Sequence, residues 1–167
     1  EDPIFLDPRN KNLGARLIIN LEKLYLSLKK LDLHNASIDE YYSISHKLGI
    51  VPKDFNKLQN KLFGIECNFE ELNGIDFKKG CYVGQENTAR IKLKNKLSKR
   101  LLPVELVKGK LKESEPIYAN NIEIGKVLIN DEYPFALVKY LDNNFKQDGE
   151  LKSENAVLRI KMPDWIK

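Results

Sequence analysis

The chain has 167 residues, of which 42% are hydrophobic and 31% are charged, and its formal net charge at pH 7 is +4. It can bury a core, but it has no apolar run near the roughly 20 residues of a membrane span, no signal-peptide pattern and only two cysteines. These features exclude a membrane protein, a cystine-rich secreted fold and a disordered tail, and they favour a reducing compartment. Because the first residue is Glu1 and the only methionine is Met162, we expect the chain to be part of a longer polypeptide.

The first thirty residues predict an extended start followed by a strand and a helix. The Asp7–Pro8 pair disfavours helical backbone, and the short apolar segment 13–19 predicts a strand. Asn20 is a helix-capping residue followed by leucines at helical spacing. This pattern predicts a helix over 21–31.

A second helix is expected after a second capping residue. Ser37 is followed by two acidic residues, which the helix dipole favours in the first turn. The helix should run to about Lys47 and stop at Gly49, because glycine readily adopts the left-handed backbone that ends helices. The segment 51–60 is more polar and is expected to be irregular.

After residue 100 the pattern changes to short apolar runs separated by turn-forming residues. Such spacing is typical of a small antiparallel barrel or sandwich, and we expect a barrel of about six strands. The strands that the pattern places are 101–106, 122–129, 135–140 and 156–160. Pro103 in the first of them indicates an edge position. The predicted fold class is therefore α+β, with a partial α/β domain over 1–96 and an antiparallel β-barrel domain over 97–167.

The most unusual local chemistry lies in the segment Lys78-Lys79-Gly80-Cys81-Tyr82-Val83-Gly84-Gln85-Glu86. A helix-compatible run from Gln85 to Ile91 follows, so the Cys81 thiol is expected near a helix N-terminus and beside two lysines, which favour the reactive thiolate. We expect this thiol to be partly accessible and beside a cleft. The alternative is a small buried hydrophobic residue, the usual state of a free cysteine. Cys67 has no such surroundings and is assigned to the core, and the Cys and His spacing matches no zinc site.

Three carboxylates, Glu66, Glu70 and Glu71, lie just before this segment. Carboxylates can do acid–base work or accept hydrogen bonds from a heterocycle, whereas a solvated acidic turn is the common interpretation of the last two. Glu66 lies between Ile65 and Cys67 and is expected to be more buried, which requires a polar partner.

A basic run follows the predicted helix and consists of Lys92, Lys94, Lys96, Lys99 and Arg100. Such a run can bind a phosphate backbone or the anionic tail of a ligand. No aromatic residue interleaves with it to stack on bases, so a solvated basic face is the favoured interpretation.

The run Lys79-Gly80-Cys81-Tyr82-Val83-Gly84-Gln85-Glu86 resembles the signature of the YgfZ family of folate-binding proteins. This family is related to the aminomethyltransferase (T-protein) of the glycine cleavage system and includes a mitochondrial iron–sulfur assembly factor. Other segments resemble the family in the same order, so the likeness extends over nearly the whole chain. They are Asp7-Pro8-Arg9, Leu13-Gly14-Ala15-Arg16, Gly49-Ile50-Val51-Pro52, Glu66-Cys67-Asn68 and Lys99-Arg100-Leu101-Leu102-Pro103. Family members are longer, so the chain is expected to be their C-terminal portion.

The resemblance implies that Cys81 is the functional thiol and that tetrahydrofolate is the cofactor. The residues that would shape the site around the thiol are Lys79, Tyr82, Gln85 and Glu86. Glu66 would face the pterin, since a carboxylate can accept two hydrogen bonds from a 2-amino-pyrimidinone edge. Arg90 and Arg100 would meet the glutamate tail of the folate.

The function that the resemblance implies is support of iron–sulfur cluster assembly or repair by a tetrahydrofolate-binding protein. Its partners would be iron–sulfur enzymes or cluster-assembly proteins, and Cys81 would accept a one-carbon adduct or handle a cluster intermediate. The alternative is an aminomethyltransferase that moves a one-carbon unit to tetrahydrofolate, against which the form of the signature argues. A nucleic-acid-binding module is the weakest interpretation. The expected location is the bacterial cytoplasm, or the mitochondrial matrix for a eukaryotic source.

Overall fold

The computed structural model describes residues 3–80, 86–93 and 97–166. The elements before the barrel are β1 (Ile4–Leu6), the 3-10 helix η1 (Lys11–Leu13), β2 (Ala15–Leu17), α1 (Leu21–Lys30), α2 (Ile38–Lys47), the 3-10 helix η2 (Phe55–Leu58) and α3 (Glu86–Leu93). The barrel elements are β3 (Arg100–Gly109), β4 (Pro116–Ala119), β5 (Ile122–Ile129), β6 (Phe135–Val138), β7 (Leu151–Lys152) and β8 (Ala156–Ile160). Among the described helices, none has the length and apolarity needed to cross a membrane.

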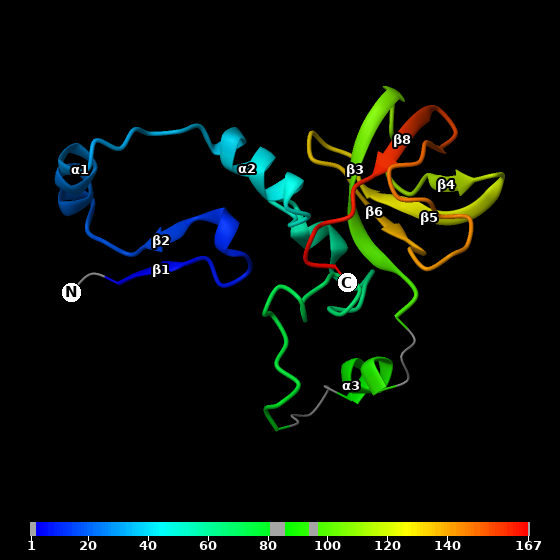
Figure 1. Ribbon diagram of the computed structural model, residues 1–167, viewed down its shortest axis with the longest axis horizontal. Helices are drawn as coiled ribbons and strands as arrows, with labels where there is room; N and C mark the ends of the chain where they lie inside the picture. Colours follow the sequence, from blue (N-terminus) through cyan, green and yellow to red (C-terminus); the bar gives the residue numbers. More distant parts are fainter. Residues whose placement is uncertain (1–2, 81–85, 94–96, 167) are drawn as a thin grey trace.

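The C-terminal part is a closed barrel with the strand order β3-β6-β5-β4-β7-β8 (Figure 1). All of its pairings are antiparallel. Every second residue of a strand faces the interior, which gives a core of small and branched side chains. The buried members include Leu102, Val104, Ile117, Ile124, Val127, Val138 and Leu158. This confirms the α+β class with a small antiparallel barrel.

Strand β3 is buried on both faces at its start, which explains its continuous apolar run. Leu102 belongs to the core inside the barrel, whereas its neighbour Leu101 belongs to a second buried cluster, with Phe135 and Cys67 among its members. Pro103 is the last residue of β3 that pairs with β6, since Val104 onward pairs with β8. The prediction of an edge position is therefore wrong, because a closed barrel has no edge and the proline lies where β3 changes partner.

The segment between α2 and residue 75 covers this outer face of the barrel. Leu58 and Cys67 are buried there against Leu101 and Phe135. At the end of α2, the His46 Nε2 lies 3.0 Å from the carbonyl oxygen of Pro134, and the imidazole packs edge-on against Phe135 with 5.2 Å between ring centroids. Burial lowers the pKa of His46, so the imidazole is held neutral. Helix α2 is thus fixed directly to strand β6.

The N-terminal part contrasts with the barrel because it buries little. Figure 1 shows β1, β2 and α1 on the far side of α2 from the barrel. All residues of the two paired strands are exposed, and α1 has no buried residue although Leu21 and Tyr25 are apolar or aromatic. A two-stranded sheet alone is only marginally stable in water. The rigid framework is therefore the barrel with its covering segment.

Both capped helices are confirmed. The Asn20 side chain accepts a hydrogen bond from the Glu22 N–H at 2.8 Å, and Ser37 accepts one from Glu40 at 3.2 Å. Gly49 follows α2 with a φ of +73°. The prediction of an irregular 51–60 segment missed only the short η2 helix.

Other boundaries need correction. The strand expected over 13–19 is confined to β2, because Asn10 caps the turn η1 and Gly14 leaves it with a φ of +87°. Strand β6 ends at Val138 because a turn begins at Tyr140. Strands β4 and β7 were not expected from the sequence. The boundary between domains 1–96 and 97–167 stays a prediction.

Candidate functional site

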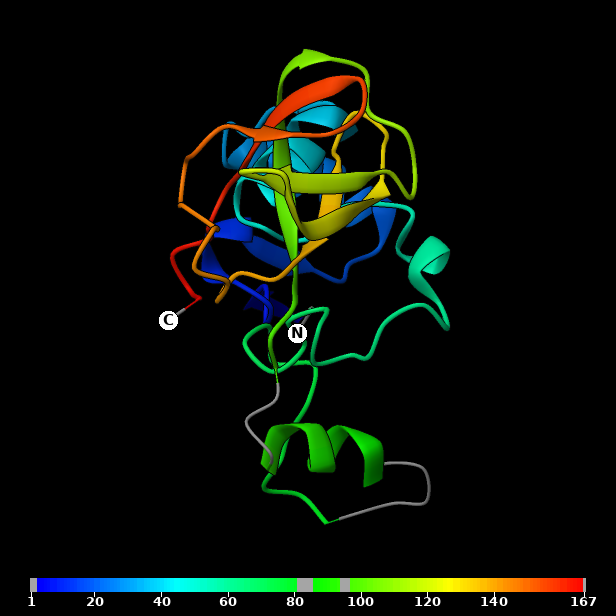
Figure 2. The ribbon, with the colours of Figure 1, turned by 90° about the vertical axis from the view of Figure 1, so that its right-hand side faces the viewer.

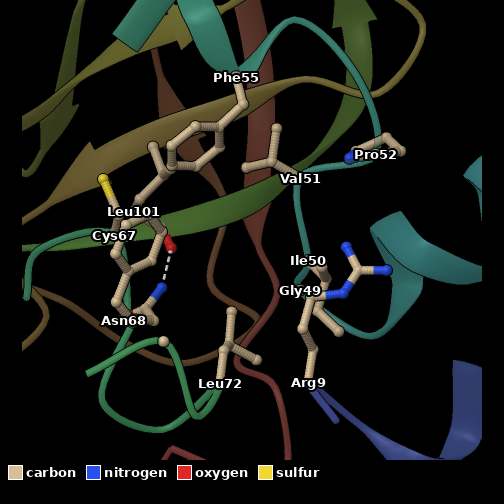
Figure 3. A pocket seen from close by; sticks show the side chains of 12 residues that line it. Arg9, Gly49, Ile50, Val51, Pro52, Phe55, Cys67, Asn68, Leu72 and Leu101 are labelled. Atoms are coloured by element: carbon tan, nitrogen blue, oxygen red, sulfur yellow. Dashed lines mark hydrogen bonds between the residues drawn. The ribbon is translucent and has the colours of Figure 1, made fainter. Parts of the chain in front are cut away.

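A first cavity of about 430 Å³ lies between the covering segment and the N-terminal hairpin (Figure 3). Its apolar wall includes Val51, Phe55, Phe69 and Leu72, and the Phe55 and Phe69 rings are stacked with centroids 5.4 Å apart. Figure 3 shows Arg9 on one side of the cavity and the Asn68–Leu101 hydrogen bond on the other. The volume falls within the usual range for small-molecule sites.

Arg9 is held by a buried carboxylate. Asp7 accepts from Arg9 Nε at 3.1 Å and from Arg9 Nη2 at 3.0 Å, and it also accepts from Arg16 Nε at 2.7 Å. Arg9 Nη2 further donates to the Tyr41 hydroxyl at 2.8 Å. The hydrogen bonds from Arg9 hold the pKa of Asp7 well below its usual range. The β1–β2 hairpin thus fixes the Arg9 guanidinium at the cavity wall. Its Nε and Nη2 already donate hydrogen bonds to Asp7 and Tyr41.

Asn68 and Cys67 on the opposite wall are structural. Both ends of the buried Asn68 amide are bonded, since Nδ2 donates to the Leu101 carbonyl at 2.8 Å and Oδ1 accepts from Arg100 Nη1 at 3.0 Å. Burial raises the pKa of the Cys67 thiol to about 12, so it is not a thiolate at neutral pH. The assignment of Cys67 to the core is confirmed. The polar groups on this wall of the first cavity are therefore committed to the fold.

A second cavity of about 440 Å³ lies between α3 and the start of the barrel. Its walls come from Ile91 and Lys92 of α3, from Glu71, and from Arg100 and Tyr140 of the barrel part. Figure 2 shows α3 below the barrel, beyond the start of β3. The chain reaches α3 directly from the signature segment, and Ile91 of this cavity lies in the second turn of the helix that begins at Glu86, the last signature residue.

The second cavity contains a buried ion pair with two unused hydrogen-bonding atoms. Arg100 is 7% exposed, and its Nη2 lies 2.5 Å from Glu71 Oε1. Arg100 Nε and Glu71 Oε2 are buried and have no hydrogen-bond partner among the described residues. A buried donor or acceptor without a partner is costly. The second cavity therefore offers the unsatisfied polar groups that orient a ligand, and we take it as the candidate site.

The structure does not bring the predicted site residues that it describes together in one cavity. Glu66 is half-buried, its Oε2 accepts from the Phe63 N–H at 3.0 Å, and its carboxylate belongs to the wall of neither cavity described above. Arg90 is exposed on α3, and Lys79 is exposed before the signature cysteine. The predictions for Cys81, Tyr82 and Gln85 lie outside the described residues. Glu86 is the first residue of α3, and its side chain is likewise outside the description.

The basic run does not form one continuous charged face in the described part. Lys92 pairs with Glu70 and lies 5.1 Å from the centroid of the Phe77 ring, and Arg100 pairs with Glu71. Opposite charges thus neutralise both ends of the run. Within the described ranges, no group of three or more His, Cys, Asp or Glu side chains could hold a metal ion.

The sequence did not predict two of the charged groups at these cavities. The Asp7–Arg9–Arg16 cluster lies within segments that carry the family resemblance, but nothing in the spacing shows that one carboxylate joins both arginines. The sequence favours a solvated turn for Glu71, because its partner Arg100 is 29 positions away. The signal of this pairing in the sequence is the acidic pair Glu70 and Glu71, followed by the basic run that contains Lys92 and Arg100.

Comparison with known proteins relates the chain to one group. A Dictyostelium discoideum protein named "Iron-sulfur cluster assembly factor IBA57 homolog, mitochondrial" is 31% identical over 102 residues, which cover 60% of the chain and 25% of that protein. The Neurospora crassa protein of the same name is 37% identical over 97 residues, covering 58% of the chain and 22% of that protein. No protein-family model matches the chain.

The likeness to a third protein extends along nearly the whole chain. The Yarrowia lipolytica IBA57 homolog is 26% identical over 180 aligned residues, which cover 98% of the chain and 36% of that protein. The chain thus spans about a quarter to a third of the length of these curated relatives. Their mitochondrial names agree with the location expected for a eukaryotic source. These matches relate the chain to the IBA57 homologs and agree with the resemblance of its signature to the YgfZ family.

Proposed function

We propose that the protein supports iron–sulfur cluster assembly and that it binds tetrahydrofolate. The observation that carries the proposal is the match to the IBA57 homologs, whose names state a role in cluster assembly. The match to the Yarrowia protein covers 98% of the chain and therefore includes the signature. The partners proposed are iron–sulfur enzymes or cluster-assembly proteins, in the mitochondrial matrix if the source is eukaryotic.

The second cavity supports the folate part of the proposal. A pterin needs a concave site with apolar walls and a few fixed polar groups, and here Ile65, Ile91 and Leu141 accompany the Glu71–Arg100 pair. Helix α3 begins at Glu86, the last residue of the signature, and its residues Ile91 and Lys92 line the cavity. We propose Cys81 as the functional thiol that acts once the ligand is bound.

The remaining signature and helix residues complete the proposal. Those expected to shape the surroundings of the thiol are Lys79, Tyr82, Gln85 and Glu86. Arg90, exposed on α3, is the proposed contact for the anionic glutamate tail. Arg100 suits that role less, because its two terminal nitrogens are already bonded to Asn68 and Glu71.

A chimera tests the proposed function. The chain replaces the matched region of the Yarrowia relative, and the chimera is expressed in Yarrowia cells that lack the natural protein. We expect the activity of a mitochondrial iron–sulfur enzyme to be restored, and Cys81→Ala to reduce it to the level of the deletion strain. The measurement is enzyme activity in isolated mitochondria, normalised to the amount of chimera.

Cys67→Ala is the matched control, because Cys67 is a buried thiol of high pKa and its loss should leave the restored activity largely unchanged. A chimera that accumulates to normal levels but restores no activity would contradict the proposed function. Full restoration by the Cys81→Ala chimera would instead contradict the role of that thiol.

A further inference from the structure

We infer that the Glu71–Arg100 pair, rather than Glu66, binds the amide edge of the pterin ring in the second cavity. The inference rests on the proposed function, since it assigns a binding residue to the same ligand. It begins from two atoms, Glu71 Oε2 and Arg100 Nε, that are buried and lack hydrogen-bond partners.

These two atoms are complementary to one chemical group. An ionised carboxylate oxygen only accepts hydrogen bonds, and a guanidinium nitrogen only donates them. A ligand that satisfies both must therefore carry a donor and an acceptor close together, because Glu71 and Arg100 touch each other at 2.5 Å. A cyclic amide has this arrangement, with its N–H beside its C=O. The pyrimidinone ring of a pterin is such an amide, with N3–H as donor and O4 as acceptor.

The rest of the Arg100 side chain is fixed, so that Nε can serve as a rigid donor. Its Nη1 donates to Asn68 at 3.0 Å, and its Cζ lies 5.4 Å from the centroid of the Tyr140 ring. Asn68 is in turn bonded to the backbone of β3 through Leu101. Groups held in this way lose little freedom when a ligand binds, which favours affinity and orientation.

Glu66 is less suited to the same task in this structure. Its Oε2 already accepts from the Phe63 backbone N–H, which closes the turn over 63–66. Its carboxylate contributes to neither the first nor the second cavity wall. A pterin bound by Glu66 would have to compete with this turn, whereas Glu71 Oε2 has no partner to lose.

Calorimetric titration of the chain with 5-formyltetrahydrofolate tests the inference. We expect Glu71→Gln to weaken binding at least about tenfold, because it removes a charge-assisted hydrogen bond and the charge that pairs with Arg100. The matched control is Glu66→Gln, which alters a carboxylate that lines neither cavity. It should bind within about twofold of the unchanged chain.

A second variant, Leu141→Trp, tests the inference independently in case Glu71→Gln does not fold. Leu141 is 66% exposed and lines the same cavity, so Leu141→Trp fills the space and leaves the ion pair intact. It should weaken binding at least as strongly. If the unchanged chain binds but Glu66→Gln weakens binding while Leu141→Trp does not, the inference is wrong and the proposed function stands. If the unchanged chain does not bind, the folate part of the proposed function fails, and the inference fails with it.

Discussion

Phe135→Ala is expected to lower the free energy of unfolding by about 3–5 kcal/mol, the usual cost of truncating a buried phenylalanine. Phe135 is 0% exposed and begins β6, where it pairs with both Pro103 and Ile129. Its ring belongs to the cluster that joins the barrel to the covering segment, and it contacts His46 of α2. The truncation would leave a cavity where these three parts meet. Equilibrium unfolding in urea measures the loss.

Phe63→Ala is the control for this prediction, because Phe63 lies in the same covering segment but is 50% exposed. It should cost less than about 1 kcal/mol, as expected for a substitution near the surface. Equal losses for the two variants would show that the cluster around Phe135 does not hold the covering segment to the barrel.

Gly49→Ala is expected to have the next largest effect, because two independent penalties coincide at this residue. The left-handed backbone, with a φ of +73°, costs an alanine about 1–2 kcal/mol relative to glycine. A β-carbon would also lie 2.1 Å from Pro163 Cγ and 3.3 Å from Trp165 Cζ2, so the C-terminal segment would have to move. That movement would strain the 2.7 Å hydrogen bond from Trp165 Nε1 to the Leu48 carbonyl.

The fluorescence of Trp165, the only tryptophan, reports this movement directly. We expect Gly49→Ala to shift the emission toward that of an exposed indole and to lower the midpoint of thermal unfolding. Gly80→Ala is the control, since a β-carbon there meets no atom of the described residues within 4 Å. An unshifted emission together with an unchanged midpoint in Gly49→Ala would show that the end of α2 does not pack against the C-terminal segment as described.

The elements that the sequence predicted well are those with strong local signals. Helices α1 and α2 follow capping side chains, Asn20 and Ser37, which act within three residues and can be read directly. Strands β5 and β8 have the predicted bounds because their apolar runs end at turn-forming residues. Local signals are thus sufficient where capping side chains or turn-forming residues mark the bounds of the element.

The weakly predicted elements depend on distant partners. Strand β7 has only two residues and exists because it pairs with β8 on one side and with β4 on the other, where Tyr118 is opposite Lys152. Pro103 appeared to mark an edge because the closure of the barrel is invisible in a linear pattern. The same limit applies to the candidate site, since Glu71 and Arg100 come together only when the covering segment packs on the start of β3.

The most direct test of the account is calorimetric titration of 5-formyltetrahydrofolate into the chain and into its Cys81→Ala variant. The account predicts saturable binding at one site in both, because the cavity binds the ligand and the thiol acts afterwards. Absence of binding in both, with the chain folded by circular dichroism and by the emission of Trp165, would contradict it. The likeness to the YgfZ-like family would then reflect the fold and not a shared ligand.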